Sequence, residues 1–171
     1  MLRPTQDRVR EALFSSLAAL LPGASFLDLY AGTGSVGIEA WSRGAGSVCW
    51  VEQDRRAFRV LRENIDALSE ASSSCKVLPC CMAVEAFCQR ASGGPFDVIF
   101  ADPPYGRNRS HEGDIAAVFM KATLLKPRGI LVLEQAVGDC MPAVCEEVWQ
   151  LLRERRYGSS QLRYFQMKGK A

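Results

Sequence analysis

The sequence predicts an α/β fold in which helices cover both faces of a mostly parallel β-sheet. Short apolar segments that suit strands alternate along the chain with longer segments whose apolar residues have helical spacing. This alternation is typical of parallel sheets, because the crossover between two parallel strands is usually a helix. The chain has 171 residues, and we expect residues 1–171 to form a single domain.

The first half of the chain predicts three helices and two strands. Val9, Leu13 and Leu17 are spaced as on one face of a helix, and Thr5 can cap the start of that helix. The other predicted elements are a strand over 25–30, a helix over 35–42, a strand over 47–52 and a helix that follows Asp54.

The second half continues the alternation and then changes character. Strands are predicted over 76–80, 97–101 and 129–134, and helices near 83–91 and 114–124. Residues 144–156 have an apolar spacing that a helix could use, but Trp149 and Leu151 also alternate with polar neighbours. Since residues 157–160 suit a turn and residues 162–166 alternate again, we expect a C-terminal antiparallel hairpin.

Composition limits the class of protein. No apolar run approaches the roughly 20 residues that a membrane helix needs, and the first residues lack the apolar segment of a signal peptide. The seven cysteines form no Cys-x-x-Cys pair and the chain has one histidine, so we expect free thiols and no metal site. These features predict a cytoplasmic protein that contacts no membrane.

Basic residues are unevenly placed, although the net charge is only +2. Arg3, Arg8 and Arg10 lie close to the N-terminus, and Arg107 and Arg109 follow the fourth predicted strand. The C-terminal hairpin segment also carries more basic than acidic residues. Such clusters are often solvated faces, but they also suit a phosphate-rich partner, and we expect the five named arginines to contact RNA.

The most informative local feature is Asp102-Pro103-Pro104-Tyr105, which ends the fourth predicted strand. Two successive prolines have no N–H donor and fix their own φ, so the segment leaves the strand as stiff, extended backbone. A carboxylate and a neighbouring carbonyl can accept both hydrogens of an –NH2 group, and the ring of Tyr105 offers a face for a flat base. An Asp-Pro strand end also occurs without any function, but this order of groups suits chemistry at the exocyclic amine of a nucleobase.

A glycine-rich turn follows the first predicted strand. Gly32, Gly34 and Gly37 let the backbone approach a ligand at the start of a helix, in a pattern shared with dinucleotide-binding proteins. Asp28 would repel a pyrophosphate but attract an ammonium group, and Glu52 at the end of the next strand can accept hydrogen bonds from a ribose. The combination favours S-adenosylmethionine over NAD as the cofactor.

The chain resembles class I S-adenosylmethionine-dependent methyltransferases in these two motifs. A further run is more specific, because it resembles the signature of bacterial 16S ribosomal RNA guanine-N2 methyltransferases of the guanine 966 type. That run is Arg3-Pro4-Thr5-Gln6-Asp7-Arg8-Val9-Arg10-Glu11. The resemblance extends over nearly the whole chain and implies a Rossmann-like, seven-stranded, mostly parallel sheet with a C-terminal antiparallel hairpin. Members of the family usually begin with a further basic hairpin, which we expect to be absent here.

The resemblance also implies roles for individual residues. The amine-binding motif of the family corresponds to a catalytic set of Asp102, Pro103, Pro104 and Tyr105. Cys81 and Met82 fall where members of the family flank the adenine ring, at a position that often carries Asp or Asn. The full expected S-adenosylmethionine-binding set is Asp28, Tyr30, Ala31, Gly32, Thr33, Gly34, Glu52, Gln53, Cys81, Met82 and Asp102.

The activity implied by the resemblance is methyl transfer from S-adenosylmethionine to the exocyclic N2 of a guanine in the small ribosomal subunit. The expected partner is 16S rRNA within the 30S subunit or its assembly intermediate, and we expect a monomer. Three alternatives stay open: adenine-N6 or other amino methylation of DNA or RNA, glutamine-N5 methylation of a protein, and a nonenzymatic NAD- or RNA-binding module. DNA enzymes of the first kind usually need a separate target-recognition domain, and glutamine enzymes usually carry Asn where Asp102 stands.

Overall fold

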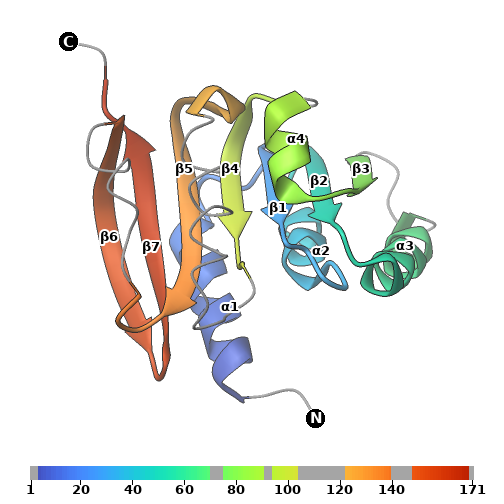
Figure 1. Cartoon of the computed structure of the whole chain (residues 1–171), viewed down its shortest axis with the longest axis horizontal. Helices are drawn as coiled ribbons and strands as arrows, with labels where there is room; N and C mark the ends of the chain where they lie inside the picture. Colours follow the sequence, from blue (N-terminus) through green and yellow to red (C-terminus); the bar gives the residue numbers. More distant parts are fainter. Residues whose placement is uncertain (1–3, 70–74, 91–93, 104–121, 140–147, 170–171) are drawn as a thin grey trace.

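The computed structural model describes residues 4–69, 75–90, 94–103, 122–139 and 148–169. Seven strands form one sheet in the order β3-β2-β1-β4-β5-β7-β6 (Figure 1). In chain order they are β1 (Ser25–Leu29), β2 (Ser47–Glu52), β3 (Lys76–Cys81), β4 (Phe96–Ala101), β5 (Leu125–Ala136), β6 (Trp149–Tyr157) and β7 (Ser160–Met167).

The direction of the strands divides the sheet into two parts. Neighbours from β3 to β5 pair in parallel. In contrast, β7 pairs antiparallel with both β5 and β6. The predictions of a mostly parallel, seven-stranded sheet and of a C-terminal antiparallel hairpin are therefore confirmed.

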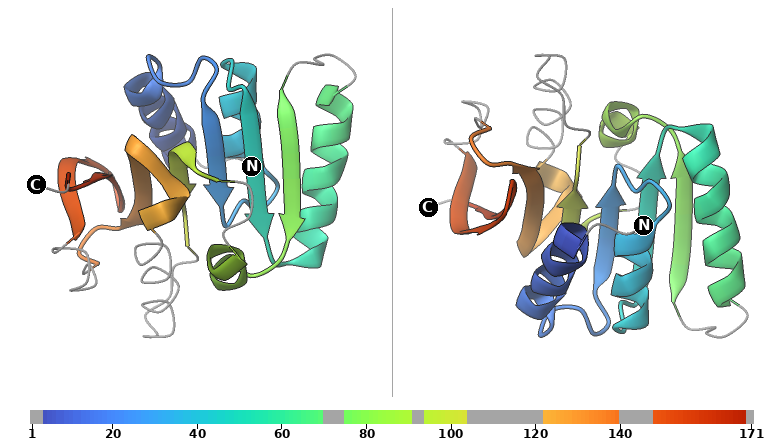
Figure 2. Two further views of the ribbon diagram at one scale, coloured as in Figure 1. Left: turned by 90° about the horizontal axis from the view of Figure 1, so that it is seen from above. Right: turned by 90° about the horizontal axis from the view of Figure 1, so that it is seen from below.

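Helices cover both faces of the sheet (Figure 2). One face carries α1 (Pro4–Leu17), α2 (Ser35–Ser42) and α3 (Arg55–Ser69), whereas α4 (Val84–Arg90) lies on the other. A short 3-10 helix, η2 (Ala122–Leu124), leads into β5. No helix among the described residues is both long and apolar enough to cross a membrane.

Each face of the sheet has its own core, because successive side chains of a strand point to opposite faces. Leu27 and Leu29 pack with α4 residues such as Phe87. Phe26 lies in the other core, with Leu13 of α1 among its members. The hydroxyls of Ser16 in α1 and Tyr164 in β7 are hydrogen-bonded at 2.8 Å, so α1 also reaches the hairpin.

Two of the differences between predicted and observed boundaries have identifiable reasons. β1 ends at Leu29 rather than at residue 30, because Tyr30 has a left-handed backbone with φ 60°. β5 begins at Leu125 rather than at residue 129, since its register with β4 shifts between Phe96 and Val98. The segment from Trp149 to Tyr157 is strand, as the predicted hairpin requires, and not the helix that its apolar spacing also allowed. The predicted helix over 114–124 falls mainly outside the described residues.

Candidate active site

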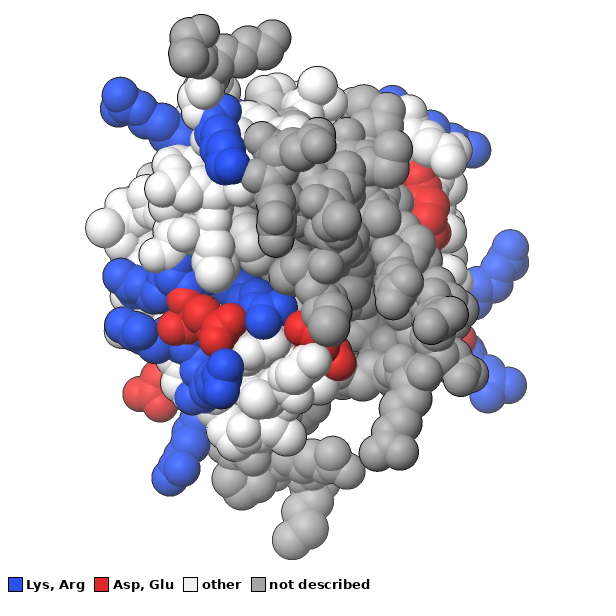
Figure 3. Space-filling model, turned by 60° about the vertical axis from the view of Figure 1, so that its left-hand side comes forward, with Lys and Arg blue, Asp and Glu red and all other residues white. Residues whose placement is uncertain are grey.

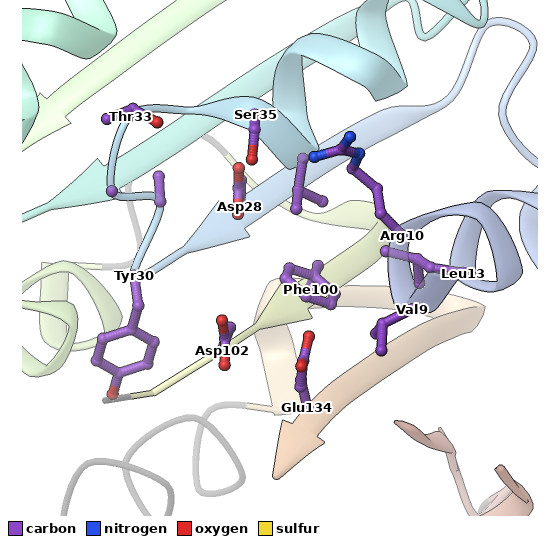
Figure 4. Close-up of a pocket in the computed structure, with 13 residues that line it drawn as sticks. Val9, Arg10, Leu13, Asp28, Tyr30, Thr33, Ser35, Phe100, Asp102 and Glu134 are labelled. Carbon is purple, nitrogen blue, oxygen red and sulfur yellow. The ribbon is translucent and has the colours of Figure 1, made fainter. Parts of the chain in front are cut away.

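The predicted motifs meet at the carboxyl edge of the parallel strands, where ligands bind in open α/β sheets. A first cavity of about 360 Å³ lies there between the ends of β1, β4 and β5 and the helix α1 (Figure 4). Its described lining residues are Val9, Arg10, Leu13, Asp28, Tyr30, Ala31, Gly32, Thr33, Ser35, Val36, Phe100, Asp102 and Glu134.

A second cavity of about 190 Å³ adjoins the end of β2. Its described lining residues are Tyr30, Val51, Glu52, Gln53, Val84 and Asp102. Tyr30 and Asp102 line both cavities and therefore mark where the two meet. Together the cavities give a cleft of the size that small-molecule ligands and cofactors use.

The glycine-rich turn connects β1 to α2 and forms one wall of the first cavity. Gly34 has φ 86°, a left-handed conformation that strains other residues, and a Cβ there would collide with Leu61. Gly37 lies so close to the indole of Trp50 that a Cβ would overlap the ring. Gly37 thus lets α2 pack against β2 and Gly34 leaves room for Leu61 of α3, so the glycine pattern has a packing role beside the predicted ligand-binding one.

Asp28 sits beneath the turn with only 2% of its surface exposed. Its Oδ2 accepts a hydrogen bond from the N–H of Gly37 at 2.8 Å. Burial is the main reason that the pKa of Asp28 rises from 3.8 to about 7, and the nearby carboxylates of Asp102 and Glu52 add to the rise. The protonation of this carboxyl therefore changes near neutral pH.

Glu52 connects the turn to the end of β2. Its two carboxylate oxygens accept from the N–H groups of Gly32 and Asp54, each at 2.7 Å. The sequence predicted a ribose ligand for this acid, whereas the structure shows that it also fixes the backbone of the turn. A carboxylate oxygen can accept two hydrogen bonds, so each oxygen of Glu52 can also accept one from a ligand in the second cavity.

Tyr30 holds an unusual conformation at the point where the cavities meet. Its φ of 60° lies in the left-handed region, which is uncommon for an aromatic residue. Ala31 continues the chain by donating to the carbonyl of Val51 at 3.1 Å, so the turn leaves β1 toward β2. Strained backbone of this kind gathers at functional sites, and here it directs the Tyr30 ring to the shared wall (Figure 4).

Asp102 directly follows β4, and its carboxylate points into the cleft beside Tyr30 (Figure 4). The next residue, Pro103, is buried. Pro104 and Tyr105, the rest of the expected catalytic set, lie outside the described residues. The stacking role expected for the Tyr105 ring therefore stays a prediction.

The other expected cofactor residues are Thr33 in the wall of the first cavity, Gln53 in the second, and Cys81 and Met82 near the end of β2. Gln53 lines it, and Thr33 is fixed through its carbonyl, which accepts from the Asn64 side chain at 3.0 Å. Cys81 ends β3 opposite Glu52 and is exposed, whereas Met82 is half-buried and donates its N–H to the Glu52 carbonyl at 3.1 Å. Neither of the last two is among the described lining residues, so their contact with an adenine ring stays a prediction.

The arginines of the N-terminal signature have different surroundings. Arg8 is exposed on α1, whereas Arg10 lines the first cavity and is paired with Asp7 and Glu39 at 2.9 Å each. Arg10 is thus a wall of the pocket, a position that the sequence did not predict. Arg3, Arg107 and Arg109 lie outside the described residues, and RNA contact by all five arginines stays a prediction.

Several lining residues were missed from the sequence, most notably Glu134 in β5 and Phe100 in β4. Helical spacing identified Val9 and Leu13 as core residues but gave no sign that α1 closes the cavity. Glu134 could have been found, because carboxyl ends of neighbouring parallel strands meet at one edge. Among the described residues there is no group of three or more metal-ligating side chains, and the described cysteines are free.

Comparison with known proteins gives a consistent picture. A family model described as "Conserved hypothetical protein 95" matches residues 1–166. The ribosomal RNA small subunit methyltransferase D of Haemophilus influenzae is 32% identical over 166 residues, which is 96% of this chain and 83% of that protein. This chain belongs to the ribosomal RNA small subunit methyltransferase D family. The family resemblance predicted from the N-terminal signature is therefore confirmed.

Solved structures agree with the family. A methylase from Haemophilus influenzae has a TM-score of 0.77 at 32% identity, covering 95% of this chain and 98% of that one. Magnesium protoporphyrin IX methyltransferase from Synechocystis, solved with bound S-adenosylmethionine, has a TM-score of 0.72 at 16% identity, covering 96% and 80%. The second likeness shows the fold alone, and that fold is the Rossmann-like fold of S-adenosylmethionine-dependent methyltransferases.

Proposed function

We propose that this member of the methyltransferase D family transfers a methyl group from S-adenosylmethionine to N2 of guanine 966 in 16S rRNA. The position of Asp102 carries the proposal, because this carboxylate lies where the two cavities meet. It can hold the target amine beside a cofactor that extends from Asp28 in the first cavity to Glu52 in the second. The printed names of the relatives support rRNA of the small subunit as the substrate.

The charge of the cleft fits S-adenosylmethionine. Asp28, Glu52, Asp102 and Glu134 line the two cavities, and Arg10, the cation among their described lining residues, is already paired with acids. S-adenosylmethionine carries a sulfonium and an ammonium group, which acids attract, whereas a dinucleotide carries a pyrophosphate, which they repel. An ammonium group near Asp28 would also favour the ionised form of that buried carboxyl.

The residues of the chain contribute positioning rather than covalent chemistry. When bound, S-adenosylmethionine supplies a methyl group on a positively charged sulfur and departs as a neutral thioether. Asp102 and the Pro103 carbonyl are expected to accept the two amine hydrogens, so that the N2 lone pair faces the methyl group. Asp102 is also placed to accept the proton that N2 loses, and such alignment supplies a large part of catalysis in reactions of two bound partners.

The exposed surface of the β6–β7 hairpin suits an RNA backbone. Lys and Arg gather over the β6–β7 hairpin around a small acidic group (Figure 3). Arg153, Arg155 and Arg156 are exposed there, and Glu154 holds Arg163 at 2.8 Å. The helix α1, which carries Arg8, packs on the same hairpin through Ser16. The proposed substrate is the 30S subunit or its assembly intermediate, with the protein acting as a cytoplasmic monomer.

The direct test is transfer of labelled methyl groups to 30S subunits that lack the modification, followed by nucleoside analysis. We expect N2-methylguanosine at a single position, and no incorporation into subunits already methylated there. Asp102→Asn serves as the matched control, since it should abolish transfer while binding of S-adenosylhomocysteine persists. Label in N6-methyladenosine, or in a protein, would overturn the proposal.

A further inference from the structure

Glu134 projects into the first cavity although no motif of the sequence drew attention to it. It belongs to β5, and its carboxylate points toward the space beside Asp102 and below the Phe100 ring (Figure 4). Phe100 and Val9 are both buried and supply apolar walls on this side of the cavity. The glycine-rich turn lies on the other side, so Glu134 faces the part of the cavity that is farther from the turn.

The register of the sheet places Glu134 next to Asp102. Ala101 of β4 pairs with Leu133 of β5, and each of the two acids is the residue that follows. Their side chains share a face, because Phe100 and Val132, two positions earlier, both belong to the core under α1. Neighbouring strands are about 5 Å apart, so two carboxylates stand side by side at this edge.

We propose that Glu134 selects guanine by accepting a hydrogen bond from its N1–H while Asp102 holds its N2 amine. This inference rests on the proposed function, because Asp102 must first hold the amine of the target base. Guanine carries the N1–H and N2–H donors next to each other on one edge, and an ionised carboxylate is purely an acceptor. Adenine carries a bare N1 beside its amine, so its lone pair would face the carboxylate of Glu134.

The distinction matters because an amine-holding carboxylate alone cannot tell the two purines apart. Both bases offer an exocyclic –NH2 group to Asp102 and a flat face to an aromatic ring. A site built to pair with a substrate N–H rejects an analogue that lacks it, since its own polar group is then buried without a partner. Glu134 gives the cavity such a group on the correct side of Asp102.

The test uses 30S subunits assembled with either guanine or 2-aminopurine at the target position. 2-Aminopurine keeps the 2-amine but has a bare N1 and no oxygen at C6. We expect the wild-type protein to methylate guanine at least tenfold faster, as one well-placed base contact predicts. In Glu134→Gln the preference should fall severalfold or more, because a carboxamide can donate to a bare N1 as well as accept from N1–H.

Two controls make the result specific. Glu63→Gln makes the same chemical change on the exposed surface of α3 and should leave the preference unchanged. Binding of S-adenosylhomocysteine, measured by calorimetry, should be unaltered in Glu134→Gln, because the residue contacts the base and not the cofactor. A loss of that binding equal to the loss of rate would overturn the inference.

The remaining outcomes separate this inference from the proposed function. If wild-type protein methylates guanine but Glu134→Gln keeps the full preference over 2-aminopurine, the function stands and the role of Glu134 is wrong. If wild-type protein methylates both bases equally, selection by N1–H is also wrong. If it methylates neither, while subunits with an adenine at the position accept a methyl group, both proposals fail together.

Discussion

The two sides of the active-site edge use acidic residues in different ways. At the ends of β1 and β2, Asp28 and Glu52 accept hydrogen bonds from the backbone of the glycine-rich turn. At the ends of β4 and β5, Asp102 and Glu134 direct their carboxylates into the first cavity (Figure 4). The first pair therefore shapes the wall on which a cofactor rests, whereas the second pair is placed to contact a substrate.

This difference predicts that substitutions on the two sides separate cofactor binding from turnover. A change at the β4–β5 side should reduce the rate and spare affinity for the cofactor product. A change at the β1–β2 side should alter cofactor affinity and folding stability together, because Asp28 and Glu52 each hold the backbone that forms the cofactor site.

The largest effect is expected from Asp102→Ala. Loss of a preorganised group at the reacting centre typically lowers turnover by about a hundred- to a thousandfold, and we expect a loss in that range. Affinity for S-adenosylhomocysteine should change less than about threefold, because the turn and the β2 end stay intact. The measurement pairs single-turnover methylation of 30S subunits with calorimetry of S-adenosylhomocysteine binding. Equal losses of rate and affinity would show that Asp102 does not act separately from the cofactor-binding side.

Asp28→Asn should make the stability of the protein less sensitive to pH. The folded pKa of Asp28, about 7, lies above its unfolded value of 3.8, so its contribution to stability is full below about pH 4 and is lost as pH rises through 7. An amide stays neutral and can still accept from the N–H of Gly37. The variant should therefore gain stability relative to wild type between pH 4 and 7, by up to about 4 kcal/mol.

The measurement is urea denaturation of both proteins at several pH values, without cofactor. A companion titration should show that wild-type affinity for S-adenosylhomocysteine rises with pH up to about 7, since a ligand ammonium prefers the ionised carboxylate. Parallel stability curves for the two proteins would show that burial does not raise the pKa of Asp28.

Glu52→Ala should weaken cofactor binding and folding at once. The substitution leaves the N–H groups of Gly32 and Asp54 without their acceptor, and hydrogen bonds to charged groups contribute about 1.5–3 kcal/mol each. Affinity for S-adenosylhomocysteine should fall by about tenfold or more, with a lower urea midpoint. Glu52→Gln should lie between wild type and Ala, and Glu63→Ala on α3 is the control for losing an exposed acid.

The smallest effect is expected at the hairpin surface. Arg153 and Arg155 are exposed, and the Arg153 guanidinium lies 6.0 Å from the centre of the Tyr164 ring. Replacing both with serine should weaken binding to 30S subunits at low salt and reduce the slope of log affinity against log salt by about one for each phosphate that the protein no longer neutralises. The same change at Arg62 of α3 should leave the slope unaltered, and a slope equal to wild type in the hairpin variant would remove these arginines from the interface.

Much of the fold could be predicted because local patterns and long-range packing agree. The spacing of Val9, Leu13 and Leu17 marked the buried face of α1, and the alternation around Leu162 marked β7. The early start of β5 could not be predicted, since Lys126, Pro127 and Arg128 show no alternation and join the strand only through a register shift against β4. Such shifts depend on a neighbouring strand that is distant in sequence.

The residues of the candidate site also fall into those that the sequence identifies and those that it does not. Asp28, Gly32, Glu52 and Asp102 could be identified because each belongs to a motif with a fixed place after a strand. Glu134 belongs to no motif and could have been found only from its place at the carboxyl end of a predicted strand, and the position of Arg10 in the cavity wall arises only when α1 is packed against those motifs. The hydrogen bond that Glu52 accepts from the backbone N–H of Gly32 could also be identified only in the structure.

The left-handed backbone at Tyr30 is unfavourable for folding, but it positions a side chain that lines both cavities. Such a conformation costs about 1–3 kcal/mol in a residue with a side chain, and glycine would remove most of that cost. A search for more stable variants that scores folding alone would therefore choose glycine at this position. That choice would remove the aromatic ring that lines both cavities. A library of variants selected for higher stability should therefore keep Tyr30 and vary residues outside the cleft.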